Sequence, residues 1–187
     1  MRQLRRTDDA GVTLIELVVT VMLLGAVMTL VGSLFVTSLR TQTTVRNATA
    51  ASREAQSISD SLANGIRNAS AFRVTVPSGT DQLLVAKVAD AAAATISWRC
   101  IAWYYSATAK TLRSTQLVVP YTAPTSEPTT WTLLGTGITP RTGTTVFSVS
   151  GQTLSFAFTS AASGTAPVAL TGSAYARTGV AATTSCY

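Results

Sequence analysis

The chain has 187 residues, of which 47% are apolar and 12% are charged, with a net charge of +6 and no histidine. High apolar content with few charges excludes disorder for most of the chain, and the lack of histidine excludes histidine-based catalytic triads and histidine-ligated metals. Two cysteines alone cannot hold zinc, and no G-x-x-x-x-G-K-[ST] phosphate loop occurs. We therefore expect no enzyme activity, no metal and no cofactor.

Residues 1–11 form a short polar leader with three arginines, and an apolar run follows from Val12. No charged residue occurs from Leu17 to Leu39. A helix of that length would extend about 35 Å, against about 30 Å for the hydrocarbon core of a bilayer. We expect residues 12–39 to cross the membrane once, with the arginines on the cytoplasmic side and the rest of the chain outside.

Two ordinary interpretations of this segment each fail on one feature. A removable secretory signal has an apolar region of about 7–15 residues, and this run is longer. A plain membrane anchor does not explain Glu16, because a carboxylate within an apolar segment is costly and is by default functional. Residues 11–16 read G-V-T-L-I-E. This resembles the class III signal of type IV prepilins, whose pattern is G, then usually F, then T-L-I-E, with Val12 here in place of Phe.

The resemblance implies a processing step and an assembly contact. In the family a prepilin peptidase cuts after the glycine, here between Gly11 and Val12, and then methylates the new amine, here that of Val12. In a filament Glu16 would meet the Val12 amine of a neighbouring subunit, which relieves the cost of an uncompensated carboxylate. The alternative is an interfacial Glu16 that reaches the lipid headgroups. Other implied partners are further pilin subunits and an assembly platform with its motor.

A long helix is predicted from about Thr13 to about Ala69, since no proline occurs before Pro77. Beyond residue 45 the apolar residues are spaced by three, four or seven, which places them on one stripe of a helix. They are Val45, Ala48, Ala55, Ile58, Leu62, Ile66, Ala69 and Phe72. We assign residues 40–72 to this amphipathic half of the helix and residues 73–187 to an extracellular head. Type IV pilins have this shape, with the second half of the helix packed on a β-sheet.

The head is predicted to be an antiparallel β-structure, so the expected class is α+β. The predicted elements, in chain order, are a strand within Asp81–Asp90, a connector Ala91–Ala94, a hairpin of Thr95–Ser106 and Thr111–Val119, a loop Pro120–Pro128, a hairpin of Val146–Val149 and Thr153–Thr159, and a last strand within Ala166–Ala176.

Alternate residues of the strand Thr95–Ser106 share a face. We expect its more apolar face to pack on the helix; that face consists of Ile96, Trp98, Cys100, Ala102 and Tyr104. Cys100 and Cys186 would lie outside the membrane, where thiols oxidise. We predict a disulfide between them that ties the C-terminal tail to this strand, with free or intermolecular thiols as the alternative.

A DNA-binding surface is a second hypothesis for the same hairpin. Arg99, Trp103 and Tyr105 share the other face of the strand, and Lys110 and Arg113 follow it. Cations interleaved with aromatic rings can bind single-stranded DNA by charge and stacking. The alternative is an edge hairpin that is protected by charges, with its aromatic residues packed locally.

The resemblance to prepilins thus implies a structural protein, and the layout of its head resembles the minor pilins of the W and J types. It would be held in the cell membrane by one helix and then moved into an extracellular filament. A major pilin and a minor pseudopilin of a type II secretion or DNA-uptake machine are alternatives within the family. A membrane-anchored extracellular binding module without any filament role is an alternative of another class.

Overall fold

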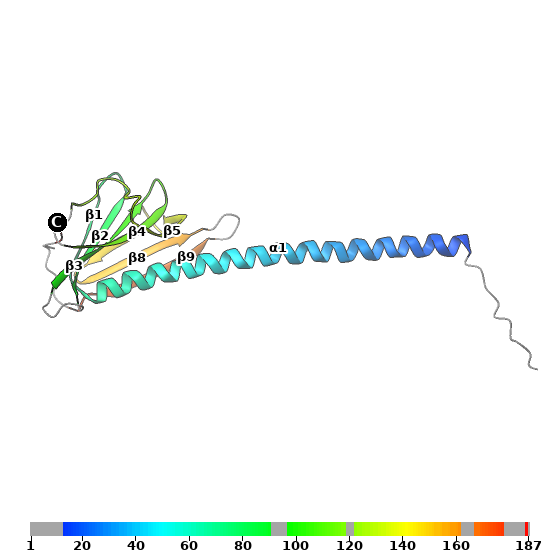
Figure 1. Ribbon diagram of the computed structural model, residues 1–187, viewed down its shortest axis with the longest axis horizontal. Helices are drawn as coiled ribbons and strands as arrows, with labels where there is room; N and C mark the ends of the chain where they lie inside the picture. The colour runs from blue at the N-terminus through cyan, green and yellow to red at the C-terminus, as the bar shows by residue number, and fades with distance from the viewer. Residues whose placement is uncertain (1–12, 91–96, 119–121, 162–166, 178–185, 187) are drawn as a thin grey trace, which may run out of the picture. The chain divides into compact units, whose positions relative to one another are not determined.

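The structure, a computed structural model, describes residues 13–90, 97–118, 122–161, 167–177 and 186. In these residues one helix, α1 (Leu14–Arg67), precedes nine strands, β1 to β9 (Figure 1). The chain divides into two units, Met1–Thr43 and Thr44–Tyr187. The predicted α+β class is confirmed, with one long apolar N-terminal helix whose second half packs on antiparallel sheet.

In the first unit every described side chain is exposed. This part of α1 reaches a mean hydropathy of 2.5, so its length and composition suit a membrane crossing. Its hydroxyl groups are satisfied inside the helix, because Thr20, Thr29 and Thr37 each donate to the carbonyl oxygen four residues earlier, at 2.7–2.9 Å. Such internal bonds let threonine occupy an apolar environment without an unpaired polar group.

The second unit contains two antiparallel sheets. The five-stranded sheet has the order β1-β2-β3-β4-β5. Its strands are β1 (Ala69–Thr75), β2 (Gln82–Asp90), β3 (Ser97–Ser106), β4 (Thr111–Val118) and β5 (Thr132–Thr136). In the second sheet β8 pairs with β9 on one side and with β6 and β7 on the other. Its strands are β6 (Ile138–Pro140), β7 (Phe147–Ser150), β8 (Thr153–Ser160) and β9 (Val168–Tyr175).

The predicted first strand, both hairpins and the last strand are confirmed as β2, β3–β4, β7–β8 and β9. Strands β1, β5 and β6 were not predicted. The predicted connector at 91–94, residues 95–96, residues 119–121 and residue 166 lie outside the described residues.

The assignment of residues up to 72 to the helix is wrong, because α1 ends at Arg67 and Ala69 begins β1. Asn68 closes the helix, with its side-chain Nδ2 donating to the Asn64 carbonyl oxygen at 3.0 Å. Ala69 and Phe72 keep the apolar spacing of the helix, but they are buried residues of a strand. Spacing alone could not distinguish the two structures over so short a segment.

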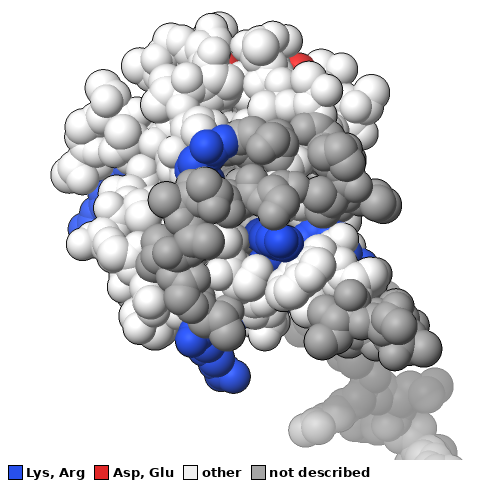
Figure 2. All heavy atoms as spheres, turned by 90° about the vertical axis from the view of Figure 1, so that its left-hand side faces the viewer, with Lys and Arg blue, Asp and Glu red and all other residues white. Residues whose placement is uncertain are grey.

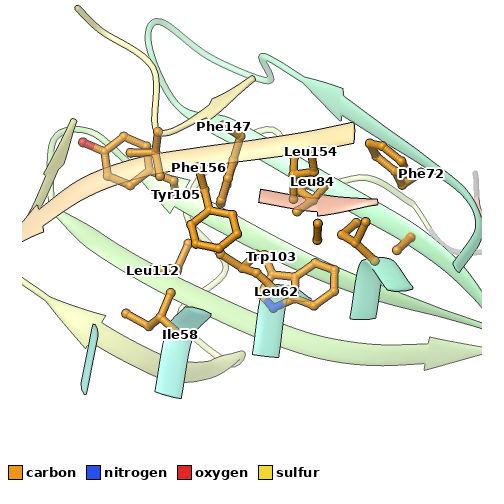
Figure 3. Close-up of a cluster of buried hydrophobic side chains, with 14 of the residues drawn as sticks. Ile58, Leu62, Phe72, Leu84, Trp103, Tyr105, Leu112, Phe147, Leu154 and Phe156 are labelled. Atoms are coloured by element: carbon orange, nitrogen blue, oxygen red, sulfur yellow. The ribbon is translucent and has the colours of Figure 1, made fainter. Parts of the chain in front are cut away.

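The main core lies between the second half of α1, one face of the five-stranded sheet and the second sheet. Ile58 and Leu62 of α1 are fully buried in it. Figure 3 shows Leu62 beside the indole of Trp103, with Phe156 of β8 close to both. The helix is also tied to the sheet edge, since Glu54 Oε1 accepts a bond from the backbone N–H of Thr136 at 2.9 Å.

The face of β3 that was predicted to meet the helix is the wrong one. Trp103 and Tyr105 lie in the core with α1, and Trp103 Nε1 donates to Ser61 Oγ of the helix at 3.0 Å. Gly65 of α1 lies so close to the indole that a Cβ there would overlap it. The opposite face forms a second buried cluster, which contains Leu83, Val85, Cys100, Ala102, Tyr104 and Cys186. Because both faces of β3 are covered, apolar composition could not identify the helix-facing one.

The turn between β3 and β4 holds Lys110 in the left-handed region, with φ of 55°. Its side chain is exposed. A side chain costs about 1–2 kcal/mol in this region, whereas glycine adopts it freely. We expect Lys110→Gly to raise the free energy of unfolding by about 0.5–1 kcal/mol. This is less than the strain that is relieved, because glycine also has greater conformational freedom in the unfolded chain.

Urea unfolding of the detergent-solubilised chain measures this gain. Lys110→Ala is the matched control, because it removes the charge but keeps the Cβ, and it should give no gain. A loss of stability in Lys110→Gly would contradict the explanation.

Candidate functional site

The start of α1 is an N-terminal capping arrangement. Gly11 and Val12 lie outside the described residues. Thr13 precedes the helix, and its Oγ1 accepts a bond from the Glu16 backbone N–H at 3.3 Å. Thr-x-x-Glu is the sequence of a capping box, and a carboxylate in the first turn also interacts favourably with the helix dipole. Glu16 therefore occupies a position at which a carboxylate favours the start of a helix, in addition to the assembly role implied by the resemblance.

Exposed apolar side chains surround Glu16 along the helix. From Leu14 to Leu39 the large apolar residues are 41–83% exposed. An apolar surface of this extent is normally buried in lipid or against other proteins. Any such burial takes Glu16 out of water. An unpaired carboxylate is strongly unfavourable in the apolar surroundings that result.

The predicted disulfide is present. Cys100 of β3 is bonded to Cys186, and both residues are fully buried. The bond attaches the penultimate residue of the chain to the central strand of the five-stranded sheet. It lies on the face that α1 does not cover, next to the partly buried Ala123 and Trp131.

The predicted DNA-binding surface is not formed. Trp103 is 0% and Tyr105 1% exposed, so neither ring can stack on a base. Arg99 shares the helix-facing side of the sheet with Trp103, whereas Arg113 pairs in register with Tyr104 and so lies on the other side. Lys110 is exposed in the turn. These side chains therefore do not share one surface.

The charges themselves also argue against a DNA site. Arg113 Nε bonds Glu127 Oε1 at 2.7 Å, and this contact, with a further bond from the Thr111 hydroxyl, lowers the pKa of Glu127. On the end of the head drawn in Figure 2 the blue atoms of Lys and Arg stand in several separate places. Scattered cations do not give the continuous track that a phosphate backbone requires.

A buried tyrosine lies on the disulfide side of the sheet. Tyr104 donates its phenolic hydroxyl to Asp81 Oδ2 at 2.8 Å, and Asp81 Oδ1 accepts from the Ala107 N–H at 2.8 Å. Burial raises the pKa of Tyr104 well above its usual 10, and the bond to Asp81 and the nearby negative charges raise it further. Burial raises the pKa of Tyr105 as well.

These raised pKa values predict a loss of stability in alkali. The unfolded state releases the phenolic protons above pH 10 while the folded state retains them, so stability is complete below pH 10 and falls above it. Each tyrosine should contribute a slope of about 1.4 kcal/mol per pH unit. Urea unfolding between pH 8 and pH 11 measures the slope, which should be less steep in Tyr104→Phe. An unchanged slope in that variant would contradict the assignment.

A cleft of about 830 Å³ lies beside the last turns of α1, over the part of the sheet that the helix leaves open. The helix supplies Ser61 and Asn64 to one wall, Asn68 directly after the helix adds to it, and β3 and β4 supply the floor. The lining residues are Ser61, Asn64, Gly65, Asn68, Val88, Ala89, Arg99, Ile101, Trp103, Ser114, Thr115, Gln116 and Thr132. This volume is within the range of about 300–1,000 Å³ that is typical of ligand sites. Sequence patterns gave no sign of the cleft, because its residues come from five separate elements.

Within the described residues, no group of three or more His, Cys, Asp or Glu side chains comes together to hold a metal ion. A scan against protein-family models and searches of curated proteins and of solved structures found no match to this chain. The function must therefore be argued from the residues of the chain itself.

Proposed function

We propose that this chain is a structural subunit of a type IV pilus or a related filament, and most specifically a minor pilin. It is made as a prepilin, is cleaved between Gly11 and Val12, and is held in the membrane by the first half of α1 until assembly. The G-V-T-L-I-E sequence at residues 11–16, whose last three residues begin a long exposed apolar helix, carries this proposal.

In the filament the apolar half of α1 is buried against the helices of other subunits. Cleavage gives Val12 a positively charged amine, and methylation preserves that charge. Glu16 then pairs with the Val12 amine of a neighbour, so that neither charge is buried alone. The oppositely charged pair also fixes the axial position at which one subunit meets the next.

The head supports this proposal by its construction. Its core includes the second half of α1, so the helix that enters the filament also carries the head. A buried disulfide fastens the end of the chain, which suits a protein outside the membrane. The chain acts in this proposal as a substrate of the peptidase and not as an enzyme. A pseudopilin shares all these features and differs in the machine that it serves.

Processing in the presence of a prepilin peptidase tests the proposal. The full chain is co-expressed with the enzyme, and its intact mass should fall by the mass of residues 1–11, less the methyl group that is added to Val12. Gly11→Val should abolish the change, because the peptidase acts after the glycine. Thr13→Ser, which keeps a capping hydroxyl and lies outside the cleaved bond, is the matched control and should be processed normally. A wild-type chain that keeps residues 1–11 would indicate a plain membrane anchor.

A further inference from the structure

We propose that the cleft between the last turns of α1 and strands β3–β5 binds a neutral oligosaccharide. This inference concerns the head alone and does not rest on the filament role. It follows from the volume of the cleft, from the chemistry of its lining, and from side chains there that make no hydrogen bond to a described residue.

The helical wall and the sheet floor present polar groups to the same space. Ser61 and Asn64 are three residues apart on α1, so they lie on one face of the helix, and Asn68 follows directly after the helix ends. On the floor, Gln116 is opposite Ile101 and Ser114 is opposite Trp103 in the register of β3 and β4. Planar amides from two different elements therefore border one cleft.

Several of these groups have no protein partner within the described part of the chain. The side-chain amide of Asn64, the amino group of Gln116 and the hydroxyl of Ser114 make no hydrogen bond to a described residue. Asn64 and Gln116 are exposed. They offer both donors and acceptors, which is the combination that a sugar hydroxyl can satisfy because it donates and accepts together.

The one charged residue among the described lining residues is already engaged. Arg99 Nη1 donates to Gln116 Oε1 at 3.1 Å, and Arg99 has a further protein interaction. The bond holds the Gln116 amide in place and directs its amino group away from Arg99. Arg99 keeps its positive charge, and the other polar side chains of the described lining are neutral amides and hydroxyls, so most of the hydrogen bonds on offer suit a neutral ligand.

Other ligand classes fit the lining less well. A peptide needs pockets for apolar side chains, and apart from the fully buried Trp103 the large apolar residues of the lining are Val88 and Ile101. A nucleic acid needs several cations and exposed aromatic faces, which the described lining residues do not provide. A sugar can place a C–H face on Ile101 and its hydroxyls on the two walls.

Binding is tested with the full chain in lauryldimethylamine oxide, a detergent without a sugar headgroup. The probes are cellotetraose, maltotetraose, mannotetraose and fully N-acetylated chitotetraose, each titrated by calorimetry. At least one should bind with a 1:1 stoichiometry and a Kd below about 1 mM. Asn64→Ala and Gln116→Ala should each raise that Kd about threefold to tenfold, since each removes one or two hydrogen bonds. Ser155→Ala, at an exposed hydroxyl on β8, is the matched control and should leave the Kd unchanged.

Each other outcome overturns the proposal. The proposal is overturned if none of the four neutral probes binds at 1 mM. It is also overturned if a probe binds with the same Kd to Asn64→Ala and Gln116→Ala as to the wild type. If tetragalacturonate binds and the neutral probes do not, the cleft is assigned to an anionic ligand. If (dT)12 binds and the neutral probes do not, it is assigned to single-stranded DNA. Unfolding curves accompany every variant, so that a weaker affinity is attributed to the cleft only where stability is unchanged.

Discussion

Replacing Glu16 by glutamine should lower the amount of this chain in sheared surface filaments by about tenfold or more, while its level in the membrane stays the same. The reason is the charge on the Val12 amine after cleavage. Without a carboxylate beside it, that amine enters an apolar helix bundle unpaired, at an effective cost of several kcal/mol. A difference of about 1.4 kcal/mol already changes an equilibrium tenfold.

The choice of substitution separates the two roles of Glu16. A glutamine at the third helical position still completes a capping box with Thr13, whereas a leucine does not. If Glu16 acts in assembly through its charge, Glu16→Gln and Glu16→Leu should be equally defective, and Glu16→Asp should retain part of the yield. If it only caps the helix, Glu16→Gln should assemble normally.

Thr29→Val is the matched control for these variants. It removes a polar group from the same apolar helix, and that group bonds only to the Gly25 carbonyl among the described residues. Filament yield should stay near that of the wild type. Immunoblots of sheared filaments and of membranes give the ratio for each variant, and normal yield in Glu16→Gln would contradict the proposed pairing.

Replacing Gln82 by leucine should lower the free energy of unfolding of the head by about 3–5 kcal/mol. Gln82 is 3% exposed and lies at the start of β2. Its Oε1 accepts from the backbone N–H groups of Val146 and Phe147 at 2.6 and 2.9 Å, and its Nε2 donates to the Phe147 carbonyl oxygen at 3.0 Å. One side chain thus connects the two sheets, and each backbone group left unpaired costs about 1–3 kcal/mol.

Gln82→Glu is a sharper version of the same test. A carboxylate can accept both N–H bonds but cannot donate to the Phe147 carbonyl oxygen, whereas a protonated carboxyl group can do both. Burial and the carbonyl oxygen should raise the pKa of the new carboxyl group above that of the unfolded chain. The stability of this variant should therefore increase as the pH falls from 7 towards about 4.3, relative to the wild type.

Urea unfolding monitored by tryptophan fluorescence measures both Gln82 variants. Gln152→Leu is the control, since Gln152 lies in the turn before β8 and its side chain makes no hydrogen bond among the described residues. It should change stability little. A Gln82→Leu variant as stable as the wild type would show that the sheets do not depend on this connection.

Local patterns in the sequence predicted the helix, both hairpins and the α+β class. The apolar run and the long segment without proline involve only residues close together in the sequence. They can therefore be recognised without knowing how the rest of the chain folds. The predicted end of the helix was wrong because Ala69 and Phe72 continue the apolar spacing of the helix by coincidence. Asn68 and the β-branched residues that follow Phe72 were the signal for a strand at that point.

Apart from the disulfide, which only two cysteines could form, the features that depend on distant residues were not predicted. The two faces of β3 are both buried, one under α1 and the second sheet and the other beside Cys186, so composition was ambiguous. The sequence therefore suggested that Trp103 and Tyr105 could stack on nucleic-acid bases, whereas both are buried in the core. Gln82 gave no sequence signal either, because its partners lie more than sixty positions away.

The intact mass of the native protein, taken separately from sheared filaments and from membranes, tests the central claim most directly. The account predicts a chain that begins at Val12, carries one added methyl group, lacks the two hydrogens of the disulfide, and occurs in the filament fraction. A chain that still carries residues 1–11 in both fractions would contradict the pilin assignment and leave a membrane-anchored binding module.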